Sequence, residues 1–426
     1  MPPPTSSLNL CSSFSCTRDS HRSSSLQVFD MFPHEISVYN RLVAILESGD
    51  VRIQEIGFVP TDCIPSDDNP NYPFVLIDDN LGISTDSISL LFEVASAIFQ
   101  SSRKLFRQQS QSIRELCQSS KILVLLNPEI YSVWNARKDL LSSGLLQLQP
   151  ELELLTLVFS KFPKSTQGWN HRHWIMRRLK SSLTDQEFHR HCQCELDVCD
   201  RASERHKTNY HAWTHRRKIV DMCPALIPQD LILSKRWCQS HLSDYSGWHH
   251  RQSLLRDAFT SESPTNQFSW IEECIFIEES IQKYPGYEAL WLHLRFVVGQ
   301  MLTPLLSQSD SSVDPRTPLE DERRLLWGRF CSSITSLKNP AEMRALHPTE
   351  ASIPDILSHI LDFVALRAQT DETAQGLDQD RKLAQRKYAL LLALWIGQAL
   401  KLNKEETKPV SARLYETGLV VAKYWR

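Results

Sequence analysis

The densest group of side chains that could do chemistry lies in the stretch HRHCQCELDVC, which holds His189, His191, Cys192, Cys194 and Cys199. Imidazole and thiolate groups are preferred ligands of zinc, but structural zinc sites usually place their cysteine pairs on a turn. Here Thr184 and Glu187 form the pattern of a helix capping box just before the stretch. On one helix, His189 with Cys192 and His191 with Cys194 would form two separate pairs that point in different directions. The spacing therefore predicts a helix, and we expect no metal in this chain.

A second group of candidate catalytic residues, His249 and His250, lies beside Arg251. His171 and His215 hold the same position next to other arginines, and this recurrence favours a structural ridge over acid–base catalysis. The sequence also lacks the local signatures of Ser-His-Asp or Cys-His nucleophiles and the glycine patterns that bind nucleotides. We therefore do not expect an enzyme that works alone.

The composition limits the class of protein. Of the 426 residues, 41% are hydrophobic and 23% are charged, which is typical of a soluble globular protein. The formal net charge of -3 gives no general reason to expect nucleic acid or an anionic membrane as a partner. No run of 18 apolar residues occurs, so stable membrane insertion is not expected. The 11 cysteines of this long chain indicate reduced thiols and a cytoplasmic protein.

Composition and periodicity divide the chain into four regions. Residues 1–27 are rich in Ser and Pro and are expected to be disordered, and translation could start at Met1 or at Met31. Residues 28–119 predict an N-terminal helix, an extended segment over residues 53–83 and a further helix. The remaining regions are five repeats over residues 120–302 and C-terminal helices over residues 303–426, at 381–403 and 411–425, with polar linkers at 303–317 and 369–380.

Five similar segments repeat along the middle of the chain. Their tryptophans lie between 35 and 44 residues apart and are Trp134, Trp169, Trp213, Trp248 and Trp291. A period of this length, with one helix pair per repeat, indicates an α-solenoid.

An arginine follows four of these tryptophans by three residues, and these arginines are Arg137, Arg172, Arg216 and Arg251. Residues three apart lie on one face of a helix. We expect the tryptophan to fill the groove between stacked hairpins and the arginine to reach carbonyls or acids of a neighbouring repeat. In the fifth segment Leu294 takes the arginine's place, with Arg295 one position late, so the series should end there.

The Trp-x-x-Arg repeat, preceded by Pro or Asn-Tyr, resembles the protein prenyltransferase α-subunit repeat over about residues 120–300. Tetratricopeptide repeats carry a Leu-Gly that these segments lack. The segments EIGFVP and PFVLIDDNLGI extend the resemblance to about residues 35–300. The resemblance implies an all-α fold, a right-handed superhelical crescent of helical hairpins. It also implies an obligate heterodimer, since such a subunit wraps around a β subunit that carries Zn²⁺ and the isoprenoid pocket.

The resemblance further implies which residues stabilise the diphosphate leaving group of the isoprenoid. Lys164, after Pro163, matches the family's Pro-Lys, and Asn209, Tyr210 and His211 match its Asn-Tyr-His. Lys164 and Tyr210 would act in catalysis, and all four would bind diphosphate. The start of a helix suits this role, because its free N–H groups favour an anion. One departure is that Ser165 and Thr166 replace the family's Asn-Tyr after the lysine.

The expected partners also come from the resemblance. They are the β subunit of the Rab-type geranylgeranyltransferase, the isoprenoid diphosphate and a protein substrate with a cysteine near its C-terminus. The residues of this chain do not distinguish a farnesyl from a geranylgeranyl donor. The alternative is a non-catalytic helical-repeat scaffold that binds other proteins. Phosphate donors at two helix starts favour the enzyme subunit, because a scaffold has no need of them.

Overall fold

The computed structural model describes residues 33–48, 53–66, 69–105, 110–260, 270–307, 324–325, 327–332, 353–368, 379–400, 402 and 404–415. The disorder expected for residues 1–27 lies outside these residues. The chain forms two compact units, residues 1–182 and residues 183–426. Within the part of the chain that the structure describes, no helix is long and apolar enough to cross a membrane.

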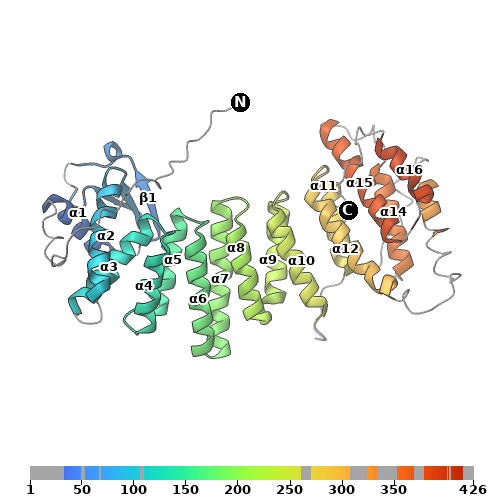
Figure 1. Cartoon of the computed structure of the whole chain (residues 1–426). Coiled ribbons are helices and arrows are strands. Elements are labelled where there is room, and N and C mark those ends of the chain that lie inside the picture. The colour runs from blue at the N-terminus through green and yellow to red at the C-terminus, as the bar shows by residue number, and fades with distance from the viewer. Residues whose placement is uncertain are drawn as a thin grey trace, which may run out of the picture. The chain divides into compact units, whose positions relative to one another are not determined.

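In its described residues, the first unit contains a small sheet and six α-helices, α1 (Pro33–Glu47), α2 (Ser87–Leu105), α3 (Ser110–Leu126), α4 (Tyr131–Ser142), α5 (Leu148–Lys161) and α6 (Thr166–Ser182). Figure 1 shows α3 with α4 and α5 with α6 as neighbouring antiparallel pairs. Each pair ends in a helix that carries one of the repeated tryptophans.

The segment predicted to be extended forms β1 (Glu55–Val59), the short helix η1 (Thr61–Cys63), β2 (Phe74–Ile77) and β3 (Asn80–Ser84). The strand order is β1-β3-β2, in which β1 runs parallel to β3 and β2 runs antiparallel to it, with Phe74 opposite Ile83. Asp78 and Asp79 both have positive φ, 46° and 63°, as a two-residue hairpin turn between right-twisted strands requires. The sequence predicted extended chain here but not this sheet.

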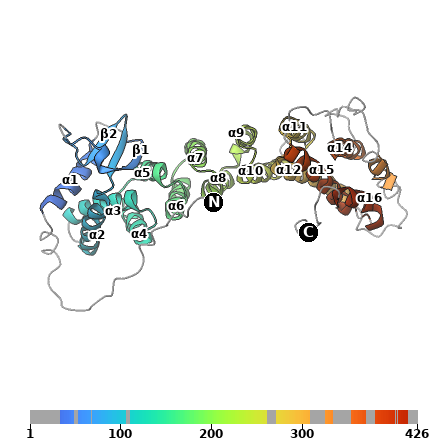
Figure 2. The same cartoon turned by 90° about the horizontal axis from the view of Figure 1, so that it is seen from above.

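The sheet is attached to the repeats of its own unit through α5. The backbone N–H of Ile56 in β1 donates a hydrogen bond of 3.0 Å to the hydroxyl of Ser160 in α5. Figure 2 shows β1 beside α5. This edge strand is therefore covered by a repeat helix and is not open to another chain.

The second unit is helical throughout its described residues and contains α7 (Asp185–Arg205), α8 (Tyr210–Met222), η2 (Pro224–Leu226), α9 (Ile227–Ser240), α10 (Tyr245–Thr260), α11 (Trp270–Lys283), α12 (Glu288–Ser307), α14 (Ile353–Ala368), α15 (Gln379–Ala399) and α16 (Lys404–Tyr415). Helices α7 to α12 form three more hairpins (Figure 1). The five hairpins confirm the prediction of a helical-repeat solenoid. Among the described residues, the small sheet is the one departure from an all-α fold.

The last hairpin packs against the C-terminal helices. Trp291 of α12 and Phe363 of α14 belong to one buried apolar cluster, which also includes Ala389 of α15. Leu294 is fully buried in this cluster, so the series of arginines ends here, as predicted. Helix α12 continues to Ser307, so residues 303–307 are helical and not the predicted linker. Most of the other predicted linker residues lie outside the described part of the chain.

Candidate functional site

The repeated tryptophans are buried, and three of them connect their helix to the turn before it. Their exposed fractions lie between 1% and 6%, in agreement with the predicted structural role. The indole N–H of Trp134 donates to the carbonyl of Pro128 at 2.7 Å, and that of Trp169 donates to Pro163 at 2.9 Å. Trp248 donates to Leu242 at 3.1 Å. The acceptor precedes the tryptophan by six residues in each case, and this bond is called the indole staple below.

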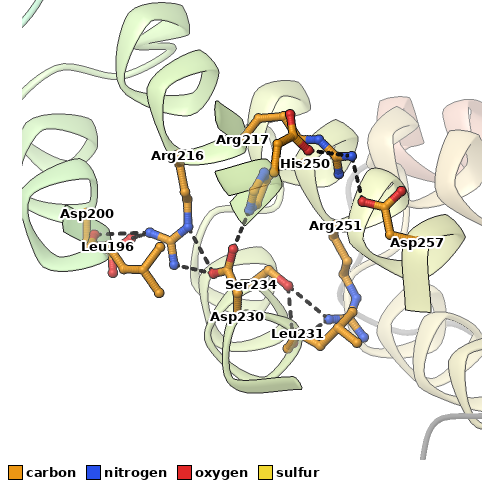
Figure 3. A network of polar contacts seen from close by, with 11 residues as sticks. Leu196, Asp200, Arg216, Arg217, Asp230, Leu231, Ser234, His250, Arg251 and Asp257 are labelled. Carbon is orange, nitrogen blue, oxygen red and sulfur yellow. Dashed lines mark hydrogen bonds and ion pairs between the residues drawn. The ribbon is translucent and has the colours of Figure 1, made fainter. Parts of the chain in front are cut away.

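The arginines connect neighbouring helices through buried ion pairs. Arg216 on α8 is 1% exposed and donates to Asp230 on α9 through Nε at 2.9 Å and through a terminal nitrogen at 2.5 Å (Figure 3). It also donates to the carbonyl of Leu196 and to Asp200 on α7. One guanidinium thus connects both helices of its own hairpin to the first helix of the next one.

The other arginines make similar contacts. Arg137 donates to Glu151 on α5 at 2.7 and 2.5 Å, and Arg251 forms two hydrogen bonds with Glu273 on α11. Arg172 donates to the carbonyl of Leu152 in its own hairpin at 2.9 Å. Arg137, Arg216 and Arg251 thus reach acids of the next hairpin, as predicted. The carbonyls that the arginines reach belong instead to their own hairpins.

A histidine shares each of these carboxylates. His171 lies 2.9 Å from Glu151, His250 lies 2.7 Å from Asp230, and His293 lies 2.7 Å from Glu273. A fourth pair, His215 with Glu195, is 2.9 Å apart. In all four pairs the acid precedes the histidine by 20 residues. The sequence analysis missed these acids, although this constant spacing is a signal that could have found them.

These buried clusters of an arginine, a histidine and a shared carboxylate are called seams below. Their charges are compensated inside the protein. Burial alone would raise the pKa of Glu151, but Arg137 and His171 outweigh it and lower that pKa to about 2. Glu273 behaves in the same way beside Arg251, with a pKa of about 2. Burial lowers the pKa of His250, so this imidazole is neutral at pH 7 and its Nε2–H donates to the carboxylate.

The ring nitrogens that face away from the acids support this assignment. Nδ1 of His171, His250 and His293 has no hydrogen-bond partner among the described residues, as a neutral imidazole that donates through Nε2 allows. Each of these rings lies against a repeat tryptophan of the preceding hairpin, for example His171 on Trp134 with centroids 4.6 Å apart. Because the seams are buried and their acids are paired, they position helices and do not reach a substrate. The burial of His171, His215 and His250 agrees with the predicted structural ridge, whereas His249 is exposed and lies outside it.

The predicted diphosphate residues lie at helix starts. Lys164 is exposed in the turn between α5 and α6, and its neighbour Ser165 caps α6 by accepting the backbone N–H of Gly168 at 3.0 Å. Tyr210 is the first residue of α8 and is 67% exposed. His211 is half-buried, and its ring lies 5.7 Å from that of Tyr210.

Asn209 has a different environment from the other predicted diphosphate residues. Its side chain is 0% exposed, accepts the backbone N–H of Ala212 at 3.2 Å and donates to the carbonyl of Ala202 at 3.1 Å. These are the bonds of a helix N-cap that also fastens α8 to α7. A buried amide used in this way has little to offer an anion, so we assign Asn209 to capping and leave it out of the proposed site.

The His/Cys stretch lies on α7, which begins with the predicted capping box of Thr184 and Glu187. Cys192 and Cys199 are buried, whereas Cys194 is exposed on another face of the helix. Among the residues that the structure describes, no group of three His, Cys, Asp or Glu side chains could hold a metal ion.

Comparison with known proteins gives the same class of protein as the repeats. The model of the family "Protein prenyltransferase alpha subunit repeat" matches residues 148–179, 192–223 and 227–258. The protein prenyltransferase alpha subunit repeat-containing protein 1 of Danio rerio is 30% identical over 293 residues, which cover 58% of this chain and 68% of the relative. The human protein of that name is 28% identical over 58% of this chain and 73% of its own length.

A more distant relative carries the name of an enzyme subunit. The geranylgeranyl transferase type-2 subunit alpha of Saccharomyces cerevisiae is 25% identical over 198 residues, or 44% of this chain and 59% of the relative. Hairpins with a buried tryptophan, arginine and shared acid define a helical-repeat protein of the prenyltransferase type. The chain belongs to the protein prenyltransferase alpha subunit family.

Proposed function

We propose that this chain is the α subunit of a heterodimeric protein geranylgeranyltransferase and is active only with a zinc-bearing β subunit. The observation that carries the proposal is the contrast between two classes of polar residue in the repeats. The arginines, histidines and acids of the seams are buried and paired. Lys164 and Tyr210 are instead exposed at the starts of helices, where an anion is favoured.

The reaction would form a thioether. The substrate cysteine's sulfur bonds to the allylic carbon while the bond from that carbon to the diphosphate oxygen breaks and diphosphate leaves. Zn²⁺ on the β subunit would favour the thiolate form of the cysteine. Lys164 would offset the growing negative charge on the leaving group, and Tyr210 and His211 would donate hydrogen bonds to it. The relative named geranylgeranyl transferase type-2 subunit alpha supports a geranylgeranyl donor. The Rab-type β subunit of this proposal rests on the resemblance of the sequence.

His211 is the feature that distinguishes the third hairpin from its neighbours. Tyr131 and Tyr245 also begin their helices and are 62% and 49% exposed, so an exposed tyrosine alone marks no site. A serine follows each of these two tyrosines, whereas His211 follows Tyr210. Of these three hairpins, only the third therefore places an imidazole beside the phenol as a second possible donor to phosphate.

A scaffold without catalytic function is the second candidate. Thr166 begins α6 where the family has a tyrosine, so a phenol donor is missing next to Lys164. Purification of the tagged full chain from cells, followed by identification of its stoichiometric partners, separates the two candidates. We expect a β subunit among the partners. We also expect the complex, but not the isolated chain, to transfer a prenyl group to a cysteine of a substrate protein. Transfer by the isolated chain, or a stable complex that contains only other proteins, would overturn the proposal.

A further inference from the structure

The third hairpin departs from the indole staple. Trp213 is 6% exposed, and its indole N–H has no hydrogen-bond acceptor among the described residues. Trp134, Trp169 and Trp248 each donate to the carbonyl six residues earlier, and Trp291 donates to the side chain of Gln385 at 3.3 Å. Trp213 is thus the exception in a series of five equivalent side chains.

The acceptor that Trp213 would use belongs to Lys207. That carbonyl accepts the hydroxyl of Thr208 at 2.7 Å and lies 3.0 Å from Nδ1 of His206. Thr208 has a φ of 57°, in the left-handed region that β-branched residues seldom occupy. In the observed turn, the carbonyl of Lys207 is therefore held by the side chains of His206 and Thr208. This arrangement leaves Thr208 strained and the buried indole N–H of Trp213 without an acceptor among the described residues.

Trp237 lies against Trp213 edge to face, with ring centroids 5.3 Å apart. An aromatic face is a weaker acceptor than a backbone carbonyl. The carbonyl of Lys207 would therefore remain the favoured partner of the indole N–H if the turn released it.

We infer that residues 206–208 form a two-state turn and that an anion at the start of α8 selects the second state. In that state the peptide between Lys207 and Thr208 is rotated, so that its carbonyl accepts the Trp213 indole N–H. The opposite end of the same peptide, the Thr208 N–H, then points away from Trp213, and the Thr208 hydroxyl is free to donate. Both donors belong to Thr208, two residues before Tyr210 at the start of α8. The rotated state thus offers a diphosphate two donors that the observed state does not.

The turn is free to make this change. Residues 204–208 are exposed, and the buried Asn209 holds the start of α8 in place through its bonds to Ala202 and Ala212. The rotation therefore needs no movement of either helix. The ligand class, a diphosphate, is taken from the proposed function, but the two-state turn rests on the geometry of this hairpin.

The test uses the full chain labelled with ¹⁵N-tryptophan, in which each of the 11 tryptophans gives one indole N–H signal. Trp213→Phe identifies the signal of Trp213. Addition of inorganic diphosphate is expected to move this signal to lower field, as a new hydrogen bond requires, while the signal of Trp248 stays in place. An equal response to sulfate at the same concentration, or a Trp213 signal that does not move, would overturn the inference.

Two variants test the turn itself. Thr208→Gly removes the strain of the observed state and also the hydroxyl that would donate in the second state, so both effects should weaken diphosphate binding, by about tenfold or more. Ser243→Gly, at the equivalent position of the fourth hairpin where the staple is already formed, should leave binding unchanged. Equal affinities for Thr208→Gly and the unaltered chain would contradict the two-state turn. Prenyl transfer by the heterodimer is measured separately. If diphosphate moves the Trp213 signal but the heterodimer transfers no prenyl group, only the proposed function is overturned. If the heterodimer transfers the prenyl group but the Trp213 signal does not move, only this inference is overturned.

Discussion

Arg216 and Arg217 are neighbours on α8 with opposite environments (Figure 3). Arg216 and its partner Asp230 are 1% and 0% exposed, whereas Arg217 is 32% exposed and pairs with Asp257 at 2.5 Å. Arg216→Met should lower the free energy of unfolding by about 3 to 5 kcal/mol, because it leaves the Asp230 charge buried without its main partner. Arg217→Met is the matched control and should cost about 1 kcal/mol or less. Urea unfolding followed by circular dichroism measures both values.

A double variant isolates the cause of this loss. Arg216→Met combined with Asp230→Asn removes both charges while an amide oxygen remains for His250 to contact. This variant should be more stable than Arg216→Met alone, because the uncompensated charge is gone. If the double variant is less stable than the single one, the loss comes from packing and not from the buried charge.

Lys164 carries the chemical prediction at the scale of single residues. In the assembled heterodimer, Lys164→Ala should lower kcat by about 100-fold, which corresponds to about 2.7 kcal/mol, with little change in affinity for the β subunit. Lys180→Ala, at an exposed lysine near the end of α6, is the control and should retain full activity. Single-turnover transfer of the isoprenoid measures the effect. A Lys164→Ala heterodimer with normal turnover would leave this lysine without a catalytic role.

The predictions from sequence at this scale succeeded where one residue type repeats at one position. Tryptophan and arginine recur three residues apart, so their burial on one face of the helix, and the kind of partner that the arginines reach, followed from helix geometry. Asn209 was interpreted as a donor to diphosphate, although its type and position fit an N-cap equally well, and only its burial decides between the two. The acids were missed because their distance from the arginines is 14 residues at Glu151 and 22 at Glu273.

At the scale of elements, the indole staple joins the second helix of the first, second and fourth hairpins to the turn before it. Trp169→Phe keeps a ring stacked on Phe159 but leaves the carbonyl of Pro163 without the indole N–H, so it should cost about 1 kcal/mol or more. Trp213→Phe loses a similar ring area but no hydrogen bond, since Trp213 has no acceptor among the described residues. It should therefore cost less than Trp169→Phe. Thermal unfolding of both variants gives the comparison, and equal losses would mean that ring size alone matters.

The elements were predictable to different degrees. The hairpins depend on short-range signals such as the capping box at Thr184, so their helices could be read along the chain. The sheet depends on pairing between β1 and β3, whose partners Glu55 and Asn80 lie far apart in sequence. Local composition reveals extended chain but not which strand lies beside which, and the parallel pairing was therefore missed.

The whole molecule repeats the same charge arrangement in both units, and this repetition predicts how its stability depends on pH. Glu151 and His171 belong to the first unit, and Asp230, His250, Glu273 and His293 belong to the second. In every one of these groups the folded pKa is lower than the ordinary value. The folded chain therefore binds fewer protons than the unfolded chain at acidic pH, so stability must fall as the pH decreases.

The pH window follows from these shifts. Stability should be highest above about pH 6.5, the ordinary pKa of histidine, and should begin to fall below it as the unfolded histidines take up protons. A steeper loss should follow below about pH 4.5, where the unfolded carboxylates are protonated but Glu151 and Glu273, with folded pKa values of about 2, stay charged. Each of these glutamates should contribute about 3 kcal/mol to the free energy of unfolding at neutral pH.

Urea unfolding of the full chain between pH 8 and pH 3 measures the dependence of stability on pH, and Glu151→Gln should reduce the slope of this curve below pH 4.5. A free energy of unfolding that stays constant from pH 7 to pH 4 would show that the seams do not hold these charges in the folded protein.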